Sequence, residues 1–112
     1  MNDASALGAL RALKECGRAE RSAVVGQNAT AAGRREVRTP GSLMIGSVAF
    51  FPEKYGQQII ALALDILANK AVPPAVFVKH TLITAENVDS FYPNDAMLSV
   101  PDADTLLWKF FH

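Results

Sequence analysis

The stretch "VVGQNATAAGRRE", residues 24–36, decides the fold because it joins a strand pattern to a helix pattern. It begins with two β-branched residues and ends in an alanine-rich, basic run. Gln27 and Asn28 stand at the junction, directly after Gly26. Asn28 is suited to cap the helix, whereas Gln27 has no capping role. The junction therefore indicates either a helix cap or a pair of amides placed to bind a ligand.

The alternation of strand and helix patterns continues on both sides of this stretch. We expect helices over 4–16, 29–39, 53–69 and 85–92, and strands over 22–27, 43–49 and 75–84. This order predicts an α/β fold with a parallel sheet flanked by helices. Right-handed crossovers would make the first two strands adjacent and parallel.

The third expected helix carries the most apolar run of the chain, "IIALALDILANKAV" at residues 59–72. Asp65 interrupts this run, which is also too short to span a bilayer, so we expect no membrane insertion. The block that we expect to be buried against the sheet is Ile59, Ile60, Ala63, Leu64, Ile66 and Leu67.

The composition excludes several classes of function. The 112 residues fit one small domain, and 11 basic residues balance 11 acidic ones, so no nucleic-acid partner is expected. The densest positive spot, Arg34, Arg35 and Arg38, is interpreted as the solvated face of a helix. Cys16 is the only cysteine, which excludes an intrachain disulfide.

Catalysis and metal binding have little support in the sequence. His80 falls inside an expected strand, His112 is the last residue, and neither belongs to a metal-ligand spacing. No glycine-rich phosphate loop precedes a helix. We therefore expect a non-enzyme with no catalytic residue, no metal and no cofactor.

Polar and aromatic residues follow the expected strands at the point where each strand ends. Gln27 and Asn28 follow the first strand, and Phe50 follows the second. Asn2 precedes the first helix and would hold the same position after a strand outside this chain. In open α/β sheets ligands bind beyond the carboxyl ends of the strands, so Asn2, Asn28 and Phe50 are expected to cluster at one edge. Each also has a structural interpretation: Asn28 as a helix cap, Phe50 as core and Asn2 as a frayed terminus.

The order of four sequence blocks resembles a known family. They are "NDASALGALRALKECG" (2–17), "AVVGQN" (23–28), "IGSVAFFPEKYG" (45–56) and "ANKAVPPAVFVKHTLITAENV" (68–88). Together they resemble the C-terminal portion of type 1 periplasmic sugar-binding proteins, the substrate-binding components of ABC importers, related to the effector domains of LacI-type repressors. The resemblance covers residues 2–93, whereas residues 94–112 stay an unassigned tail.

The resemblance implies sugar contacts at specific positions. The family's Asn–Asp pair matches Asn2–Asp3, with Asn2 the usual ligand contact. Asn28 stands where the family commonly has a carboxylate, and Phe50 stands where it often has a polar side chain. An amide both donates and accepts hydrogen bonds, as sugar hydroxyls do, and an aromatic ring can pack against the C–H face of a sugar. The candidate ligand-binding residues are Asn2, Gln27, Asn28 and Phe50.

The resemblance also implies an incomplete protein. Residues 1–93 would form part of the C-terminal lobe, without the N-terminal lobe that closes over the sugar. Sheet edges exposed in this way favour self-association. The family implies a sugar ligand, an ABC permease partner and a periplasmic or extracytoplasmic location, although "MNDASALGAL" (1–10) is no signal peptide. The alternative is the effector-binding portion of a LacI-type transcriptional regulator, which an upstream helix-turn-helix would distinguish.

Overall fold

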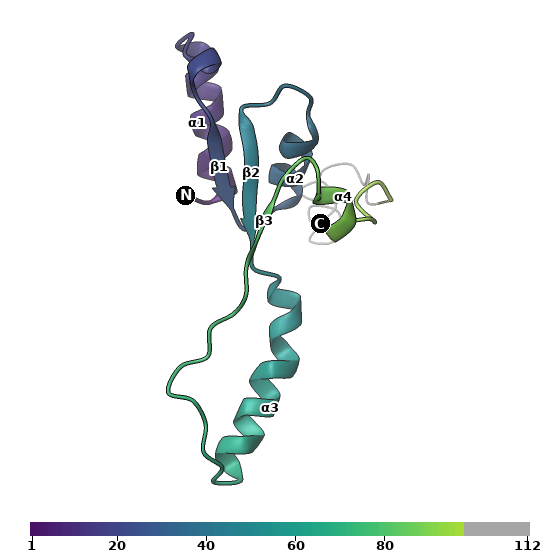
Figure 1. Ribbon diagram of the computed structural model, residues 1–112. Helices are drawn as coiled ribbons and strands as arrows, with labels where there is room; N and C mark the ends of the chain where they lie inside the picture. Colours follow the sequence, from purple (N-terminus) through teal and green to yellow (C-terminus); the bar gives the residue numbers. More distant parts are fainter. Residues whose placement is uncertain (98–112) are drawn as a thin grey trace, which may run out of the picture.

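The structure is a computed structural model and describes residues 1–97 (Figure 1). The elements are α1 (Asp3–Glu15), a 3-10 turn η1 (Ala19–Arg21), β1 (Val24–Gln27), α2 (Ala31–Arg38), β2 (Met44–Ala49), a second turn η2 (Pro52–Lys54), α3 (Tyr55–Leu67), β3 (Thr81–Ile83) and α4 (Val88–Phe91). Most of the unassigned tail lies outside the described residues.

The three strands form one sheet in the order β1-β2-β3. β1 and β2 run parallel, with Gly26 opposite Ser47 and Gln27 opposite Val48. β3 pairs antiparallel with the other edge of β2. The prediction of two adjacent parallel strands is therefore confirmed, and the carboxyl ends of β1 and β2 lie together. Of the two helices predicted to flank them, near 4–16 and 53–69, only the first does so.

The core lies between one face of the sheet and the helices α1 and α2. Its main buried cluster is Ala6, Leu10, Val24, Val37 and Met44. A second cluster joins the loop after β1 to β2, β3 and α4 and consists of Ala29, Ala49, Ile83 and Val88. At the alternate strand positions Val25 and Ile45 are exposed. The helices of residues 1–97 therefore cover only one face of the sheet.

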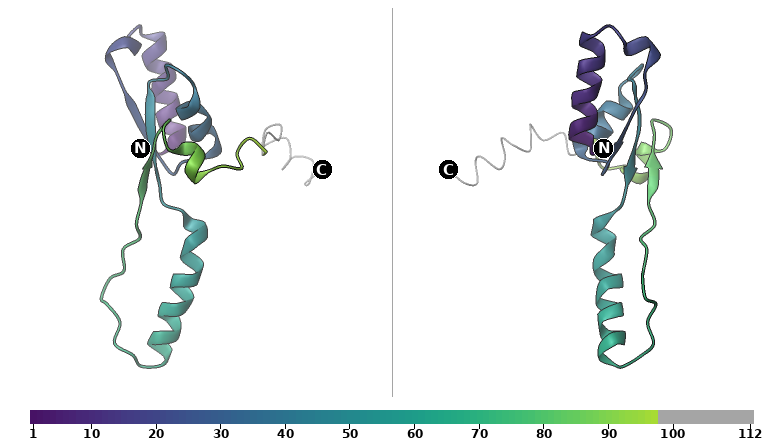
Figure 2. Two further views of the ribbon diagram at one scale, coloured as in Figure 1. Left: turned by 45° about the vertical axis from the view of Figure 1, so that its right-hand side comes forward. Right: turned by 90° about the vertical axis from the view of Figure 1, so that its left-hand side faces the viewer.

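Residues 52–80, which we call the arm, project away from this body (Figures 1 and 2). Within Tyr55–Leu67 no side chain is buried, and the exposed fraction of Leu67 is 79%. Burial of α3 against the sheet was predicted for Ile59, Ile60, Ala63, Leu64, Ile66 and Leu67, and that prediction is wrong. The apolar pattern correctly predicts a helix here, but an apolar face does not by itself place that helix against the sheet.

The third strand is also shorter than expected. Only Thr81–Ile83 pairs with β2, whereas residues 75–80 run extended along the arm without a strand partner among residues 1–97. Phe77 in this segment is 91% exposed. Like the apolar face of α3, most of this segment lies away from the body, and only its end at His80 lies against the body (Figure 2).

Candidate functional site

A shallow pocket lies at the carboxyl ends of β1 and β2. Its volume is about 520 Å³, and its lining residues are Met1, Val25, Gly26, Gln27, Val48, Phe50 and His80. The structure thus brings together two of the four predicted site residues, Gln27 and Phe50. Small-ligand sites combine a mostly apolar wall with a few polar groups, and this lining has that character.

His80 belongs to this pocket although the sequence placed it in a strand as a structural residue. Its ring lies 5.5 Å from the ring of Phe50, centroid to centroid, at a tilt of 50°. The two residues come from the two connections between body and arm, 30 positions apart in the chain. No local signal marks such a pair, because only the return of the chain from the arm brings them together.

Asn28 lies beside the pocket in a turn of unusual backbone geometry. Its φ is 97° and that of Ala29 is 46°, both in the left-handed region that non-glycine residues seldom occupy. The N–H of Asn28 donates to the carbonyl oxygen of Val48 at 2.8 Å. The helix cap is not Asn28 but Thr30, whose hydroxyl accepts from the N–H of Gly33 at 3.1 Å. Capping by Asn28 is therefore wrong, and its exposed amide is available for other contacts.

Asn2 has a structural role at the start of α1. Its side-chain oxygen accepts from the N–H of Ser5 at 2.9 Å, as expected of a helix N-cap. Within residues 1–97 no group accepts a hydrogen bond from its amide nitrogen. Met1 lines the pocket, so Asn2 lies next to the candidate site without forming its wall.

Asp3 is the polar residue that the sequence analysis missed. Its side chain is fully buried, and its carboxylate accepts three hydrogen bonds. One comes from the hydroxyl of Ser47 at 2.6 Å, and two come from the N–H and the hydroxyl of Thr30 at 2.7 and 2.9 Å. An acidic residue in a first helical turn suggests only a dipole contact, so its burial had no signal of its own.

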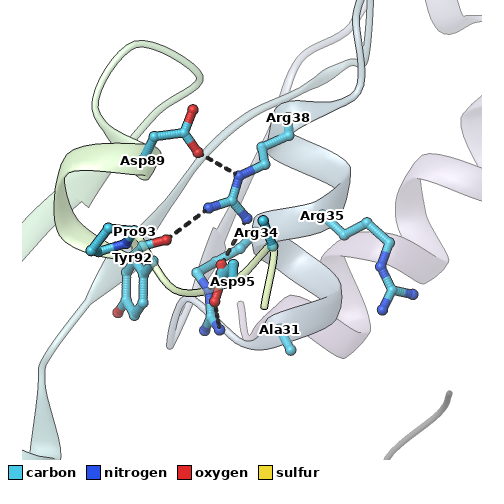
Figure 3. A pocket seen from close by; sticks show the side chains of 9 residues that line it. Ala31, Arg34, Arg35, Arg38, Asp89, Tyr92, Pro93 and Asp95 are labelled. Carbon is cyan, nitrogen blue, oxygen red and sulfur yellow. Dashed lines mark hydrogen bonds and ion pairs between the residues drawn. The ribbon is translucent and has the colours of Figure 1, made fainter. Parts of the chain in front are cut away.

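A second pocket, of about 710 Å³, lies between α2 and the segment after α4 (Figure 3). Arg34 binds Asp95 through two hydrogen bonds of 2.7 and 2.8 Å, and Arg38 reaches Asp95 at 2.7 Å and Asp89 at 3.0 Å. Figure 3 shows Arg35 pointing away from these residues. The interpretation of a solvated helix face is thus right for Arg35 and wrong for the other two arginines.

The charges of this cluster perturb its titrating groups. Hydrogen bonds from Arg34 hold the pKa of the Asp95 carboxyl below its usual value, against the opposing effect of burial. Burial lowers the pKa of Arg38, but hydrogen bonds to Asp95 and Asp89 outweigh it and raise that pKa overall. Burial raises the pKa of Tyr92, whose ring lies 4.1 Å below the guanidinium of Arg34. The acids neutralise the arginines, so this pocket fastens residues 92–95 to α2.

Residues 1–97 hold no group of three or more histidine, cysteine or acidic side chains arranged to bind a metal ion. In the same residues, no helix has the length and apolar character that crossing a bilayer requires.

The fold has counterparts among solved structures. An ABC transporter solute-binding protein from Agrobacterium vitis, with bound allitol, is 27% identical, with a TM-score of 0.65 over 79% of this chain and 30% of its own. An ABC transporter periplasmic solute-binding protein from Actinobacillus succinogenes, with bound D-allose, is 22% identical, with a TM-score of 0.64 over 80% of this chain and 31% of its own. This chain has the α/β fold of part of a periplasmic solute-binding protein.

Further comparisons set the extent of this similarity. A sugar transporter subunit from Rhodobacter sphaeroides is 29% identical, with a TM-score of 0.57 over 71% of this chain and 28% of its own. The chain therefore spans less than a third of the solute-binding proteins that it matches. No family model and no curated protein matches the sequence. The neighbours described here are transporter proteins, so the transcriptional-regulator alternative gains no support.

Proposed function

We propose that this chain is part of the sugar-binding component of an ABC importer, and that it contributes one wall of the sugar site as a portion of the C-terminal lobe. The observation that carries the proposal is the pocket of Gln27 and Phe50, which lies at the carboxyl ends of parallel strands in a solute-binding fold. Similar folds bind allitol and D-allose, so the ligand class is a sugar or a polyol. The protein acts by binding and not by catalysis.

The side chains at this edge suit a neutral polyhydroxyl ligand. The amides of Gln27 and Asn28 each donate and accept, so each can pair with a hydroxyl group that does the same. The ring of Phe50 offers an apolar surface to C–H groups, and His80 beside it adds a nitrogen that can hydrogen-bond. Asn28 in place of a carboxylate leaves this wall without a negative charge.

The arm gives a reason why binding needs a second lobe. Ile59, Leu64 and Phe77 are each at least 60% exposed, and an apolar patch of this kind marks an interaction surface. In the proposed arrangement the N-terminal lobe covers the arm and closes the sugar site from the other side. The permease partnership and the extracytoplasmic location follow from the importer role, and the edges of β1 and β3 are the candidates for self-association.

The half-site sets the expected affinity. A hydrogen bond to a solvent-exposed sugar contributes about 1 kcal/mol, and a few such bonds do not offset the lost freedom of the ligand. We therefore expect binding no tighter than about 1 mM.

Two-dimensional NMR of the full chain, titrated with D-allose, with allitol and with a panel of pentoses and hexoses, tests this proposal. We expect saturable shifts at Gln27, Asn28, Phe50 and His80. Phe50→Ala should reduce the sugar-induced shifts at the other three residues at least severalfold. Gln57→Ala, an exposed substitution on the arm, is the matched control and should leave the shifts unchanged. Saturable shifts confined to residues 55–78 of the arm or to the Arg34 pocket, or no shift with any sugar at 100 mM, would contradict the proposed site.

A further inference from the structure

The turn after β1 is held by a buried polar network that lies beside the candidate site. Three consecutive N–H groups of this turn are fixed: Asn28 donates to the backbone of β2, Ala29 to the hydroxyl of Ser47 at 2.9 Å, and Thr30 to the carboxylate of Asp3 at 2.7 Å. Ser47 in turn donates to Asp3 at 2.6 Å. Every donor of the turn therefore has a partner, and two of the three depend on Asp3 or Ser47.

The backbone of this turn needs such support. Asn28 and Ala29 both have positive φ, a conformation that is unfavourable for residues other than glycine and that persists only where the surrounding structure fixes it. For Ala29 the N–H is fixed by Ser47 and the carbonyl oxygen accepts from Arg34 at 2.6 Å. The N–H and the carbonyl oxygen of Ala29 are thus both hydrogen-bonded to side chains, whereas Asn28 stays exposed.

The carboxylate of Asp3 lies in a space that two glycines leave free. A Cβ atom at Gly26 would collide with one carboxylate oxygen, and a Cβ atom at Gly33 would collide with the other. Both glycines are close to the turn, one at the end of β1 and one in the first turn of α2. The carboxylate therefore fills a space that the sequence keeps free on two sides, where it accepts bonds from Thr30 and Ser47.

We propose that Asp3 and Ser47 are positioning residues, which hold the β1–α2 turn in its left-handed conformation and thereby set the direction of Gln27 and Asn28 toward a sugar. This inference rests on the proposed function for its ligand. Neither residue needs to touch the sugar, since both are almost completely buried, with exposed fractions of 0% and 1%. They act through the backbone of residues 28–30.

Ser47→Ala is the decisive variant, and Ser42→Ala is its matched control. The Ser42 hydroxyl also donates one hydrogen bond, to Glu36 at 2.7 Å, and accepts another, from the N–H of Met44 at 3.1 Å. Ser42 lies before the start of β2 and outside the turn. The first readout is hydrogen exchange of the Ala29 and Thr30 amides, normalised to the amides of α1. The second is the size of the D-allose shifts at Gln27 and Asn28.

We expect Ser47→Ala to speed normalised exchange at Ala29 about tenfold, the factor for one lost hydrogen bond of typical strength, and to reduce the D-allose shifts severalfold. Ser42→Ala should change neither readout. Asp3→Asn should give an intermediate result for both readouts, because the amide oxygen can still accept from Thr30, whereas the amide nitrogen cannot accept the bond that Ser47 now donates. A general loss of stability would speed exchange everywhere and would not change the normalised values.

Unchanged exchange at Ala29 in Ser47→Ala would overturn the inference. Faster exchange at Ala29 with unaltered sugar shifts would overturn the second part of the inference, that the turn directs Gln27 and Asn28 toward the sugar. If the unsubstituted chain shows no sugar shift, the proposed function fails, and the exchange ratio alone still decides whether the network holds the turn. Should Ser47→Ala not fold, Thr30→Val against Thr30→Ser tests the network at an exposed position, since valine loses the hydroxyl bonds to both Asp3 and Gly33 and serine keeps them. Faster exchange at Gly33 alone then reports the lost helix cap, and faster exchange at Ala29 reports the network.

Discussion

Gly33 and Gly8 both lie inside helices, yet alanine at these two positions is expected to shift stability in opposite directions. In an exposed helix interior, Gly→Ala stabilises by about 1 kcal/mol because glycine has more backbone freedom to lose. Gly8 fits this case, since a Cβ atom there meets nothing within 4 Å. Gly33 does not, because the added Cβ atom would lie 2.5 Å from Asp3 Cγ and still closer to a carboxylate oxygen.

The magnitude follows from what must move to admit that methyl group. The Asp3 side chain is fully buried and cannot swing into solvent. A shift of its carboxylate weakens the bonds from Thr30 and Ser47, and a hydrogen bond to a charged group contributes about 1.5–3 kcal/mol. After the helix-propensity gain is subtracted, Gly33→Ala should lower the free energy of unfolding by about 1–3 kcal/mol. Gly8→Ala should raise it by about 0.5–1 kcal/mol.

Urea denaturation followed by far-UV circular dichroism measures both changes. With a slope of about 1–2 kcal/mol per molar urea for a chain of this size, the midpoint of Gly33→Ala should fall by roughly 1 M and that of Gly8→Ala should rise by a few tenths. The slopes should stay equal to that of the parent chain. A Gly33→Ala midpoint at or above the parent value would refute the reasoning, because the space beside Gly33 would then not be filled by a fixed carboxylate.

Further outcomes concern the ion pairs, the arm and the first helix. Asp95→Asn should cost about 1–3 kcal/mol at neutral pH through the lost bonds from Arg34. The pKa of Asp95 in the folded chain lies below its usual 3.8, so the stability that its carboxylate contributes is fully present above pH 3.8 and is lost as the pH falls through the folded pKa. The urea midpoint of Asp95→Asn should therefore fall less in acid than that of the parent chain. Leu67→Ala should leave the thermal midpoint almost unchanged, because the side chain is exposed. Leu10→Ala in the core should lower the free energy of unfolding by about 2–5 kcal/mol, and equal losses in the two variants would show that the arm is packed. Asn2→Ala should cost about 1 kcal/mol in the same melts, and no loss would mean that its bond to Ser5 is not a cap.

The parts of the fold that the sequence predicted are those with local causes. Strand patterns at 22–27 and 43–49 depend on β-branched residues and short spacing, and the crossover rule makes them parallel. The burial of α3 failed because a broad apolar face gives no information about which part of a protein covers it. The prediction that residues 75–80 belong to the third strand was wrong for the same reason. Local pattern predicts an element, whereas its place depends on contacts that the element itself does not encode.

The site shows the same division between local and long-range causes. Gln27 and Phe50 were found because one ends and the other directly follows a strand of one parallel pair, and such strand ends meet at one edge. His80 was missed because it reaches the pocket only after the chain returns from the arm. Asp3 was missed because its partners lie 27 and 44 residues away along the chain. A buried charge is expensive without partners, so its presence depends on a network that no short window of sequence contains.

The body and the arm therefore differ in what stabilises them, although α1 and α3 have the same length of 13 residues. α1 is capped by Asn2 and buries Ala6 and Leu10 against the sheet, while α3 has no side-chain cap and buries nothing. An isolated helix of this length is marginal in water, so we expect α3 to need a packing partner, whereas α1 already packs against the sheet. The Asp3 network belongs entirely to the body. In the proposed importer component, the turn that carries Asn28 is thus fixed before a second lobe docks on the arm. Docking then has only to enclose the sugar against side chains that are already positioned.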